Sequence, residues 1–333
     1  MNHSRPIFLS ALLLALGCGG SLLASDLRPA SDLRPAGWLD TAGQPIQAHG
    51  GGIMRHGDTY YWYGENKDGP TKPGGCGARV DLIGIQCYTS KDLQRWTNAG
   101  IVLAPVRDDA KHDLHVSKIM ERPKVIFNPR TRKFVMWLHV DSWDYKAARA
   151  GVAVSDQATG PFRYLGSMRP NDSDSRDMTV FQDDDGKAYL IYASEGNQTL
   201  HIAELSDDYL KPTAKFTRAF AGRSMEAPAV FKHQQKYYLI ASGCTGWQPN
   251  AARSAVAASI LGPWTELANP CRGRKADTTF DSQSSFVLPL AAERYLFMAD
   301  RWNTQDLRRS GYLWTALHVD HEQVLLETPA DVP

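Results

Sequence analysis

The feature that most constrains the fold of this chain is a short aromatic β-rich run that recurs after a polar turn. Five such runs occur, at residues 57–64, 131–138, 185–192, 234–241 and 292–299. A further strand follows each of them, at 88–96, 154–162, 204–210, 258–264 and 311–317. Successive copies are roughly fifty to seventy residues apart, close to the size of a four-stranded propeller blade. Long amphipathic helices are absent from the pattern, which argues against a βα barrel. The sequence therefore predicts an all-β protein, a five-bladed β-propeller.

The N-terminus has the features of an export signal. Arg5 supplies a positive charge, and residues 7–16 form a short apolar stretch. Leu-Ala-Leu-Gly-Cys at 14–18 resembles a bacterial lipobox, which favours Cys18 as a lipidated residue, whereas small residues near 24–25 suit ordinary cleavage. We expect residues 1–24 to be a signal peptide. The mature protein is expected to be periplasmic, on the cell surface as a lipoprotein, or secreted.

A perfect tandem repeat of Ser-Asp-Leu-Arg-Pro-Ala follows the signal segment, at 25–30 and 31–36. It has no periodic apolar face and each copy contains a proline, so we interpret residues 25–37 as a flexible linker. The predicted propeller then occupies residues 38–333.

The charge balance excludes some classes of partner. The formal net charge is +1, so electrostatics gives no reason to expect binding to nucleic acid. Aromatic residues make up 10 % of the chain, which suits both a β-rich core and a sugar-binding cleft. We expect a monomer.

Export changes the interpretation of the cysteines. Besides Cys18 there are four, an even number that suggests two disulfides in an oxidising compartment. Proximity in the sequence favours the pairs Cys76–Cys87 and Cys244–Cys271. The spacings do not match a zinc site.

Three acidic residues stand within similar apolar segments. Glu121 occurs in Met-Glu-Arg-Pro-Lys-Val, Asp177 in Ser-Arg-Asp-Met-Thr-Val-Phe, and Glu226 in Ser-Met-Glu-Ala-Pro-Ala-Val. The first strand of a propeller blade lines the central channel, so the three carboxylates should meet in one pocket of blades two, three and four. Arg122 and Arg176 are adjacent to two of them, but side chains alternate along a strand, so we expect both arginines to point away.

Converging carboxylates in an aromatic-lined pocket suit glycoside cleavage. One neutral acid must protonate the leaving oxygen, and a second group must activate water or attack the anomeric carbon. Apolar neighbours make Glu226 the natural acid. We expect no cofactor. The competing use of such acids is to bind calcium, so the alternative is a structural calcium ion in the channel. The acidic run at 183–186 is interpreted as a hairpin turn.

These segments resemble glycoside hydrolase family 43, and within it the exo-β-1,3-galactanase branch. The resemblance extends from about residue 38 to 325 and is carried by the segments 47–53, 60–67, 121–128, 175–178, 226–229, 245–247 and 281–286. It implies a five-bladed propeller and hydrolysis with inversion. Glu226 would be the general acid, and Asp177 would orient it and tune its pKa.

The general base departs from the usual family pattern. The family has a catalytic aspartate on the first inner strand, where this chain reads Gln47-Ala48-His49. The galactanase branch shares this loss. Two substitutes are available: Glu121, a carboxylate, and Gln283, which matches a pocket glutamine of the branch and would act through its imidic tautomer or by positioning water. The sequence leaves the choice open.

The resemblance also implies a set of sugar-contacting residues. These are Gln47, His49, Glu65, Tyr145, Thr245 and Trp247. Trp247 is equally well explained by core packing, and His49 by packing or by binding a channel water.

The function that these observations favour is release of galactose from the non-reducing end of β-1,3-galactan, the backbone of arabinogalactan. An α-L-arabinofuranosidase or β-xylosidase of the same family is the alternative enzyme. A non-catalytic carbohydrate-binding propeller is the alternative from another class.

Overall fold

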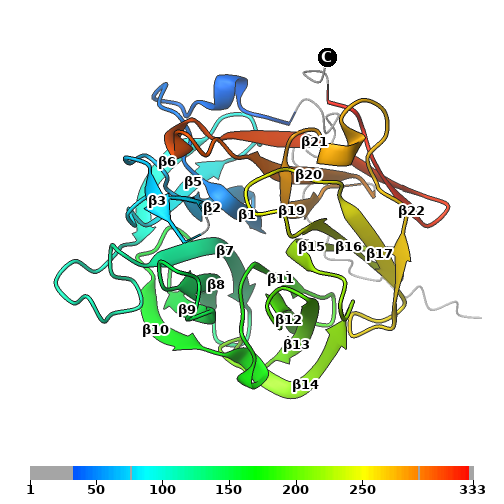
Figure 1. Cartoon of the computed structure of the whole chain (residues 1–333), viewed down its shortest axis with the longest axis horizontal. Coiled ribbons are helices and arrows are strands. Elements are labelled where there is room, and N and C mark those ends of the chain that lie inside the picture. The colour runs from blue at the N-terminus through cyan, green and yellow to red at the C-terminus, as the bar shows by residue number, and fades with distance from the viewer. Residues whose placement is uncertain (1–32, 76, 292, 330–333) are drawn as a thin grey trace, which may run out of the picture.

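The computed structural model describes residues 33–75, 77–291 and 293–329 (Figure 1). The predicted signal peptide, Cys18 and most of the predicted linker lie outside these residues, as does Cys76. Leu33, near the end of the predicted linker, is buried against the first blade.

The described chain forms five antiparallel sheets of four strands each, which surround a central axis like the blades of a propeller (Figure 1). Blade 1 contains β1 (His49–His56), β2 (Thr59–Glu65), β5 (Ile85–Ser90) and β6 (Thr97–Leu103). Blade 2 contains β7 (Ile119–Asn128), β8 (Lys133–Asp141), β9 (Arg149–Ser155) and β10 (Arg163–Met168). Blade 3 contains β11 (Met178–Gln182), β12 (Ala188–Ser194), β13 (Thr199–Leu205) and β14 (Pro212–Ala219). Blade 4 contains β15 (Met225–His233), β16 (Lys236–Gly243), β17 (Arg253–Ala257) and β18 (Trp264–Leu267). Blade 5 contains β19 (Gln283–Pro289), β20 (Tyr295–Arg301), β21 (Gly311–Asp320) and β22 (Gln323–Leu326). The predicted five-bladed β-propeller is confirmed.

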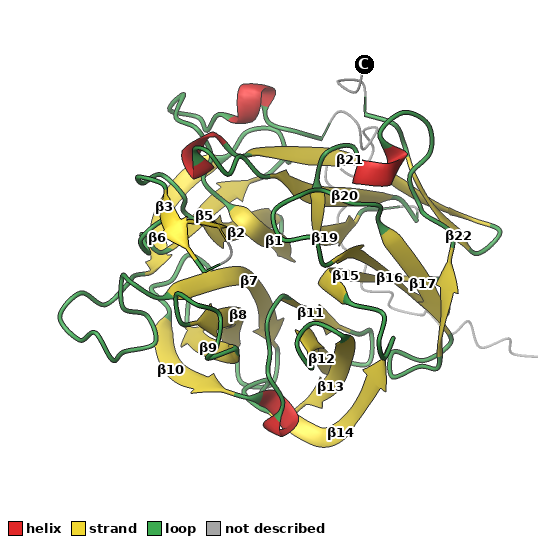
Figure 2. Ribbon diagram, in the orientation of Figure 1, coloured by secondary structure: helices red, strands yellow, loops and turns green. Residues whose placement is uncertain are grey.

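Outside the five blades, the described residues form little further secondary structure (Figure 2). A hairpin of β3 (Lys72–Gly74) and β4 (Gly77–Arg79) extends from blade 1, and short 3-10 turns cover Ala36–Trp38, Pro170–Asp172, Ala276–Thr278 and Leu307–Arg309. Within the described residues, none of the helices is long and apolar enough to cross a membrane.

The recurrent aromatic runs form the second strand of every blade. These strands are buried on both faces because each sheet is covered by the two neighbouring blades. In β8 and β12, for example, nearly every residue is buried. A strand covered on both faces has no polar side, which explains why the runs are almost continuously apolar and aromatic.

An aromatic cluster joins the first and last blades. Each blade is built from one continuous stretch of chain, so the described residues contain no strand exchange that would close the ring. Instead, Trp62 of β2 packs on Trp314 of β21 with ring centroids 4.8 Å apart, and Trp96 and Tyr312 extend the same cluster. Burial of large aromatic surfaces therefore closes the propeller.

The predicted disulfides are wrong. Cys87, Cys244 and Cys271 are free thiols. Cys87 is buried in β5 within the core between blades 1 and 2, and Cys271 packs in the core between blades 4 and 5. Cys244 is exposed at the end of β16. Proximity in the sequence failed as a guide for Cys244 and Cys271, because one is exposed and the other is buried in the core between blades 4 and 5.

Candidate functional site

A cavity of about 170 Å³ lies at one end of the central channel, where the first strands of the five blades converge. All five blades contribute to its wall. The lining residues are Glu65, Glu121, Arg122, His139, Tyr145, Arg176, Asp177, Asn197, Glu226, Gly246, Trp247, Gln283 and Trp302. The three acids expected to meet, Glu121, Asp177 and Glu226, thus line one cavity.

Glu226 lies in β15 and is held by amide groups on both sides. One carboxyl oxygen accepts from Asn197 Nδ2 at 3.1 Å, and the other accepts from Gln283 Nε2 at 3.1 Å. Burial raises the pKa of Glu226 to about 8, and the negative charge of Asp177 adds to this rise. Arg122 and the hydrogen bonds from Cys244 and Gln283 oppose it. At neutral pH this carboxyl group therefore carries a proton.

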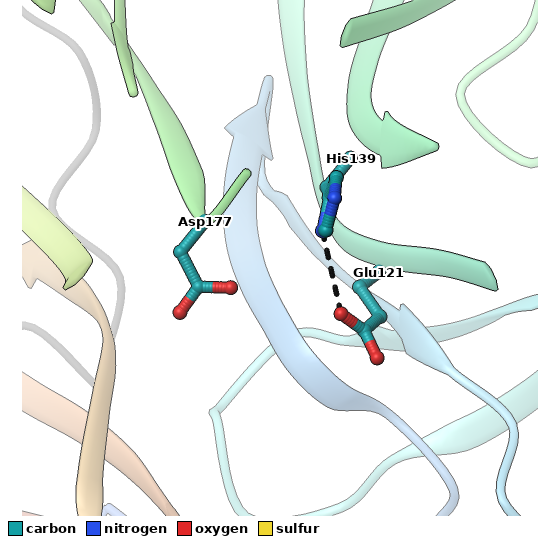
Figure 3. A group of neighbouring side chains, drawn as sticks. All are labelled: Glu121, His139 and Asp177. Atoms are coloured by element: carbon teal, nitrogen blue, oxygen red, sulfur yellow. Dashed lines mark ion pairs between the residues drawn. The ribbon is translucent and has the colours of Figure 1, made fainter. Parts of the chain in front are cut away.

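Glu121 lies in β7 and, unlike Glu226, is ionised. Its carboxylate accepts from Tyr145 Oη at 2.8 Å and lies 3.3 Å from His139 Nδ1 (Figure 3). Burial disfavours the charged form, but the hydrogen bond from His139 and the charge of Lys67 outweigh it and lower the pKa of Glu121 to about 2. At neutral pH Glu121 is therefore an anion.

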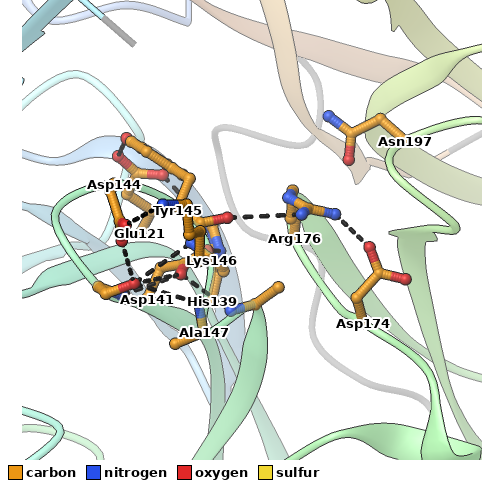
Figure 4. A network of polar contacts seen from close by, with 12 residues as sticks. Glu121, His139, Asp141, Asp144, Tyr145, Lys146, Ala147, Asp174, Arg176 and Asn197 are labelled. Carbon is orange, nitrogen blue, oxygen red and sulfur yellow. Dashed lines mark hydrogen bonds and ion pairs between the residues drawn. The ribbon is translucent and has the colours of Figure 1, made fainter. Parts of the chain in front are cut away.

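His139 owes its charge to a second carboxylate. Its Nε2 lies 2.9 Å from Asp141 Oδ2, so the ring lies between Asp141 and Glu121 (Figure 4). Burial lowers the pKa of His139, but the hydrogen bonds to Asp141 and Glu121 raise it more, to about 9. The cavity therefore contains a protonated acid and an ionised carboxylate, the separation of pKa values that acid–base chemistry requires.

The expectation that Arg122 points away from the acids is wrong. Its Nη2 atom lies 3.0 Å from Asp177 Oδ2 and donates to Gln283 Oε1 at 2.6 Å. Arg176 also lines the cavity, but it pairs with Asp174 (Figure 4). The alternation rule fails because the strand is irregular at this point.

The irregularity is a β-bulge that recurs on the inner strands. In β7 the pairing skips between Glu121 and Lys124, and Arg122 has a φ of +56°. In β15 it skips between Glu226 and Ala229, and Ala227 has a φ of +53°. The bulges contain Pro123 and Pro228, which lack an amide hydrogen for a regular ladder and suit a bulge. A bulge at this position directs the preceding carboxylate into the cavity.

Other predicted sugar-contacting residues also line the cavity. Tyr145 projects from the loop after β8, and Trp247 packs edge-on against Trp302 with centroids 5.0 Å apart. The Nε1 atom of Trp247 is buried without a hydrogen-bond partner in the described part of the chain. Glu65 is paired with Lys67 at 2.6 Å and accepts from the Arg122 amide at 3.1 Å.

Three predicted residues are placed elsewhere. His49 is fully buried, with Nδ1 3.0 Å from Asp300 and Nε2 3.2 Å from Tyr312 Oη. Gln47 is also buried and accepts from the Lys67 amide at 3.2 Å. Thr245 is exposed, and its hydroxyl donates to the carbonyl of Gln248. Among the described residues, none of the three belongs to the cavity wall.

Sequence reasoning missed several residues of the wall. The clearest are Arg122, His139, Asn197 and Trp302. Pro123 was the available signal for Arg122, because a proline on an inner strand indicates a bulge. His139 is the β-ladder partner of Glu121, a pairing that a sequence alone does not give.

Glu121, His139 and Asp177 are close enough to hold a metal ion, with ligand atoms within 4.8 Å of one another (Figure 3). They fit calcium poorly, because calcium prefers six to eight oxygen ligands and one of these ligands is a nitrogen. Each also has a protein partner: Tyr145 for Glu121, Asp141 for His139 and Arg122 for Asp177.

Comparisons with known proteins place the chain in a family. The model of glycosyl hydrolases family 43 matches residues 48–287. A comparison with curated proteins finds no match.

Three similar solved structures are named as a family 43 β-1,3-galactosidase and as exo-β-1,3-galactanases. A family 43 β-1,3-galactosidase with galactodeoxynojirimycin is 42 % identical, with a TM-score of 0.82, covering 87 % of this chain and 96 % of that protein. An exo-β-1,3-galactanase from Phanerochaete chrysosporium with galactose is 39 % identical, with a TM-score of 0.80, covering 87 % of this chain and 65 % of the fungal one. One from Clostridium thermocellum is 38 % identical, with a TM-score of 0.77, covering 87 % and 63 % of the two chains.

Proposed function

Because the chain belongs to glycosyl hydrolase family 43, we propose that it is an exo-acting enzyme that releases galactose from β-1,3-galactan with inversion. The single observation that carries the proposal is the state of the Glu226 carboxyl group. It is a protonated carboxyl group, held on both oxygens, in a cavity that also contains the ionised Glu121. The galactanase and galactosidase names of the similar solved structures supply the substrate.

Glu226 acts as the general acid. Its proton passes to the glycosidic oxygen as the bond to the anomeric carbon breaks, and the leaving chain departs as an alcohol. Asp177 supports this step because its negative charge favours the protonated form of Glu226. Water attacks the anomeric carbon from the opposite face and inverts its configuration, and one of its protons passes to the general base.

Two side chains are able to hold the attacking water. Glu121 is a carboxylate, but its low pKa makes it a weak base. Gln283 is a neutral amide that contacts the acid directly. Azide rescue separates the two: a truncated base leaves space for azide, which then forms α-galactosyl azide. Rescue of Glu121→Ala assigns the base to Glu121, and rescue of Gln283→Ala assigns it to Gln283.

The rest of the wall fits a sugar ring. Trp247 offers an aromatic side chain in the cavity wall, and Glu121 and Tyr145 form a polar pair for sugar hydroxyls. The cavity is small and is built at one end of the channel, which suits one terminal sugar unit and hence exo action.

The experiment that tests the proposal is proton NMR of purified protein digesting β-1,3-galactobiose, followed from the first minutes. We expect α-galactose as the first product. Release of β-galactose would contradict inversion. Turnover of arabinofuranosides or xylosides in place of the galactoside would assign the chain to the alternative activities of the family.

The matched variant is Glu226→Gln, which retains the shape of the side chain and removes its acidic proton. We expect a loss of kcat of about 10²–10⁴-fold, typical of acid–base catalysis. Calorimetric binding of galactobiose should survive. A wild-type protein that binds galactobiose without turnover would instead be a carbohydrate-binding propeller.

We also propose that the protein is exported from the cytoplasm. A polysaccharide substrate is met outside the cytoplasm, which agrees with the predicted signal peptide and with the predicted lipid anchor at Cys18. Mass spectrometry of the mature N-terminus tests both.

A further inference from the structure

Arg122 is a buried cation in the wall of the cavity, and its side chain is only 6 % exposed. From its contacts we infer that Arg122 is a positioning residue, which fixes the orientation of Gln283 and holds Asp177 beside the general acid. The inference rests on the proposed function, because it concerns the same site and the same reaction.

The guanidinium group connects blade 2 with blades 3 and 5. Nη2 donates to Gln283 Oε1 at 2.6 Å and lies 3.0 Å from Asp177 Oδ2. Nη1 donates to the carbonyl of Ser284 at 2.9 Å. The backbone amide of Arg122 donates to Glu65 Oε1 at 3.1 Å, which adds blade 1. A planar fork with several fixed donors can make these contacts at once, and a lysine ammonium group cannot match that geometry.

The first consequence concerns the amide of Gln283. Its Oε1 accepts from Arg122 and from Trp302 Nε1, the latter at 3.1 Å. Both partners are donors only, so a flipped amide would direct its N–H groups against N–H groups. The orientation is therefore fixed, and Nε2 faces Glu226 Oε1 and Ser242 Oγ, each at 3.1 Å. Arg122 thereby determines how the general acid is held.

The second consequence concerns charge. Asp177 and Glu226 are close enough to interact, and an isolated anion in this buried place would be costly. Arg176 is the other arginine of the cavity wall, and it pairs with Asp174. Arg122 therefore balances the charge of Asp177. The groups that act on the Glu226 proton are Asp177, Arg122, Gln283, Asn197 and Cys244.

The experiment compares Arg122→Met with Lys124→Met in the full chain, using β-1,3-galactobiose. Lys124 is an equally buried basic side chain two residues along β7, but burial lowers its pKa to about 7. It donates to the backbone carbonyls of Gly50 and Arg122 and belongs to the wall of a different cavity. Both variants lose a long buried basic side chain, and only Arg122→Met loses the contacts to Gln283 and Asp177. Thermal unfolding of each variant shows whether it folds.

We expect Arg122→Met to reduce kcat by about 10²-fold, a typical cost of a misplaced catalytic group, with KM changed only a few-fold. The basic limb of its kcat/KM profile should move to higher pH, because the positive charge that opposes protonation of Glu226 is gone. In Arg122→Ala, where the truncated side chain leaves space, guanidinium ion at millimolar concentration should restore part of kcat, and Arg122→Lys should recover less than this rescue. Lys124→Met should leave the basic limb in place.

The inference is overturned if Arg122→Met folds and retains kcat, or if its loss of activity comes with an unmoved basic limb and guanidinium does not rescue Arg122→Ala. Should Arg122→Met fail to fold, Arg122→Gln, which also removes the charge, carries the same pH test. Failure of the proposed function is distinguishable, because it would appear as a wild-type protein that does not hydrolyse galactobiose.

Discussion

At the scale of single residues, the site depends on two carboxyl groups whose pKa values lie on opposite sides of neutrality. Glu226 is neutral because it is buried beside Asp177, and Glu121 is ionised because His139, Lys67 and Tyr145 stabilise its charge. The environment sets the role of each acid, since both have the same side chain. The acid positions were predictable from the sequence. The neutral state of Glu226 was predictable from its apolar neighbours, but the ionised state of Glu121 was not, because it depends on His139, Lys67 and Tyr145 from other segments.

Replacing Asp177 by Asn tests the charge coupling. The negative charge of Asp177 raises the pKa of Glu226, so its removal lowers that pKa. The general acid must be protonated, so activity is lost as pH rises through this pKa. We therefore expect the basic limb of the kcat/KM profile, near pH 8 in the wild type, to move to lower pH. Asp185→Asn, in an exposed turn of the same blade, is the control. An unchanged limb in Asp177→Asn would mean that another group governs it.

The raised pKa of Glu226 also predicts a stability effect. A carboxyl group with a higher pKa in the folded state stabilises the fold at low pH and loses this contribution as pH rises from its unfolded value toward 8. Glu226→Gln removes this pH-dependent cost. The variant should therefore unfold at a higher temperature than the wild type at pH 8, by roughly 2 °C or more, and show little gain at pH 4. Thermal unfolding at the two pH values measures this, with the exposed Glu293→Gln as control. An equal gain at both pH values would contradict the assignment.

At the scale of elements, the bulges of the inner strands explain why an acid precedes a proline in this chain. The repeat pattern predicted the strands themselves, because apolar runs and turn residues are local signals. The bulges turn Arg122 toward the acids, and the strict alternation rule placed it on the wrong face. Pro123 and Pro228 marked the exceptions, since proline within an inner strand conflicts with a regular ladder. A sequence can therefore reveal that a strand is irregular more readily than it reveals where the displaced side chain goes.

The bulge of blade 1 provides a test with a matched pair of glycines. Gly50 and Gly43 both have positive φ, +60° and +75°. A Cβ atom at Gly50 would overlap Glu65 Oε1 and press on Arg122, whereas at Gly43 it would meet open space. Gly43→Ala should cost about 1 kcal/mol of unfolding free energy through backbone strain alone. Gly50→Ala should cost more and also reduce kcat, because it displaces the carboxylate that accepts from the Arg122 amide. Chemical denaturation and turnover of galactobiose measure both; equal effects would show that the space around Gly50 is unimportant.

At the scale of the whole molecule, the ring is closed by packing rather than by a covalent link or a shared strand. The described cysteines are free, and each blade is continuous in sequence. The blade count was predictable because each blade repeats one local unit. The closure was not, because the contact between Trp62 and Trp314 joins segments about 250 residues apart, and no local signal reports on such a pair.

Closure of the ring by aromatic packing predicts that replacing two equally buried tryptophans increases hydrogen exchange over regions of different extent. Trp62 lies at the seam between blades 1 and 5, and Trp137 lies between blades 2 and 3; both are essentially inaccessible. Each change to Ala should cost about 3–5 kcal/mol. At the seam, however, no chain connection holds the two blades together, so Trp62→Ala should open them locally before global unfolding. Hydrogen exchange should then increase across blades 1 and 5 in Trp62→Ala and stay smaller and nearer the site of change in Trp137→Ala. Trp143→Ala, which alters a side chain in an exposed loop, should leave exchange unchanged. If the two buried variants gave the same pattern, the aromatic seam would have no special part in closing the propeller.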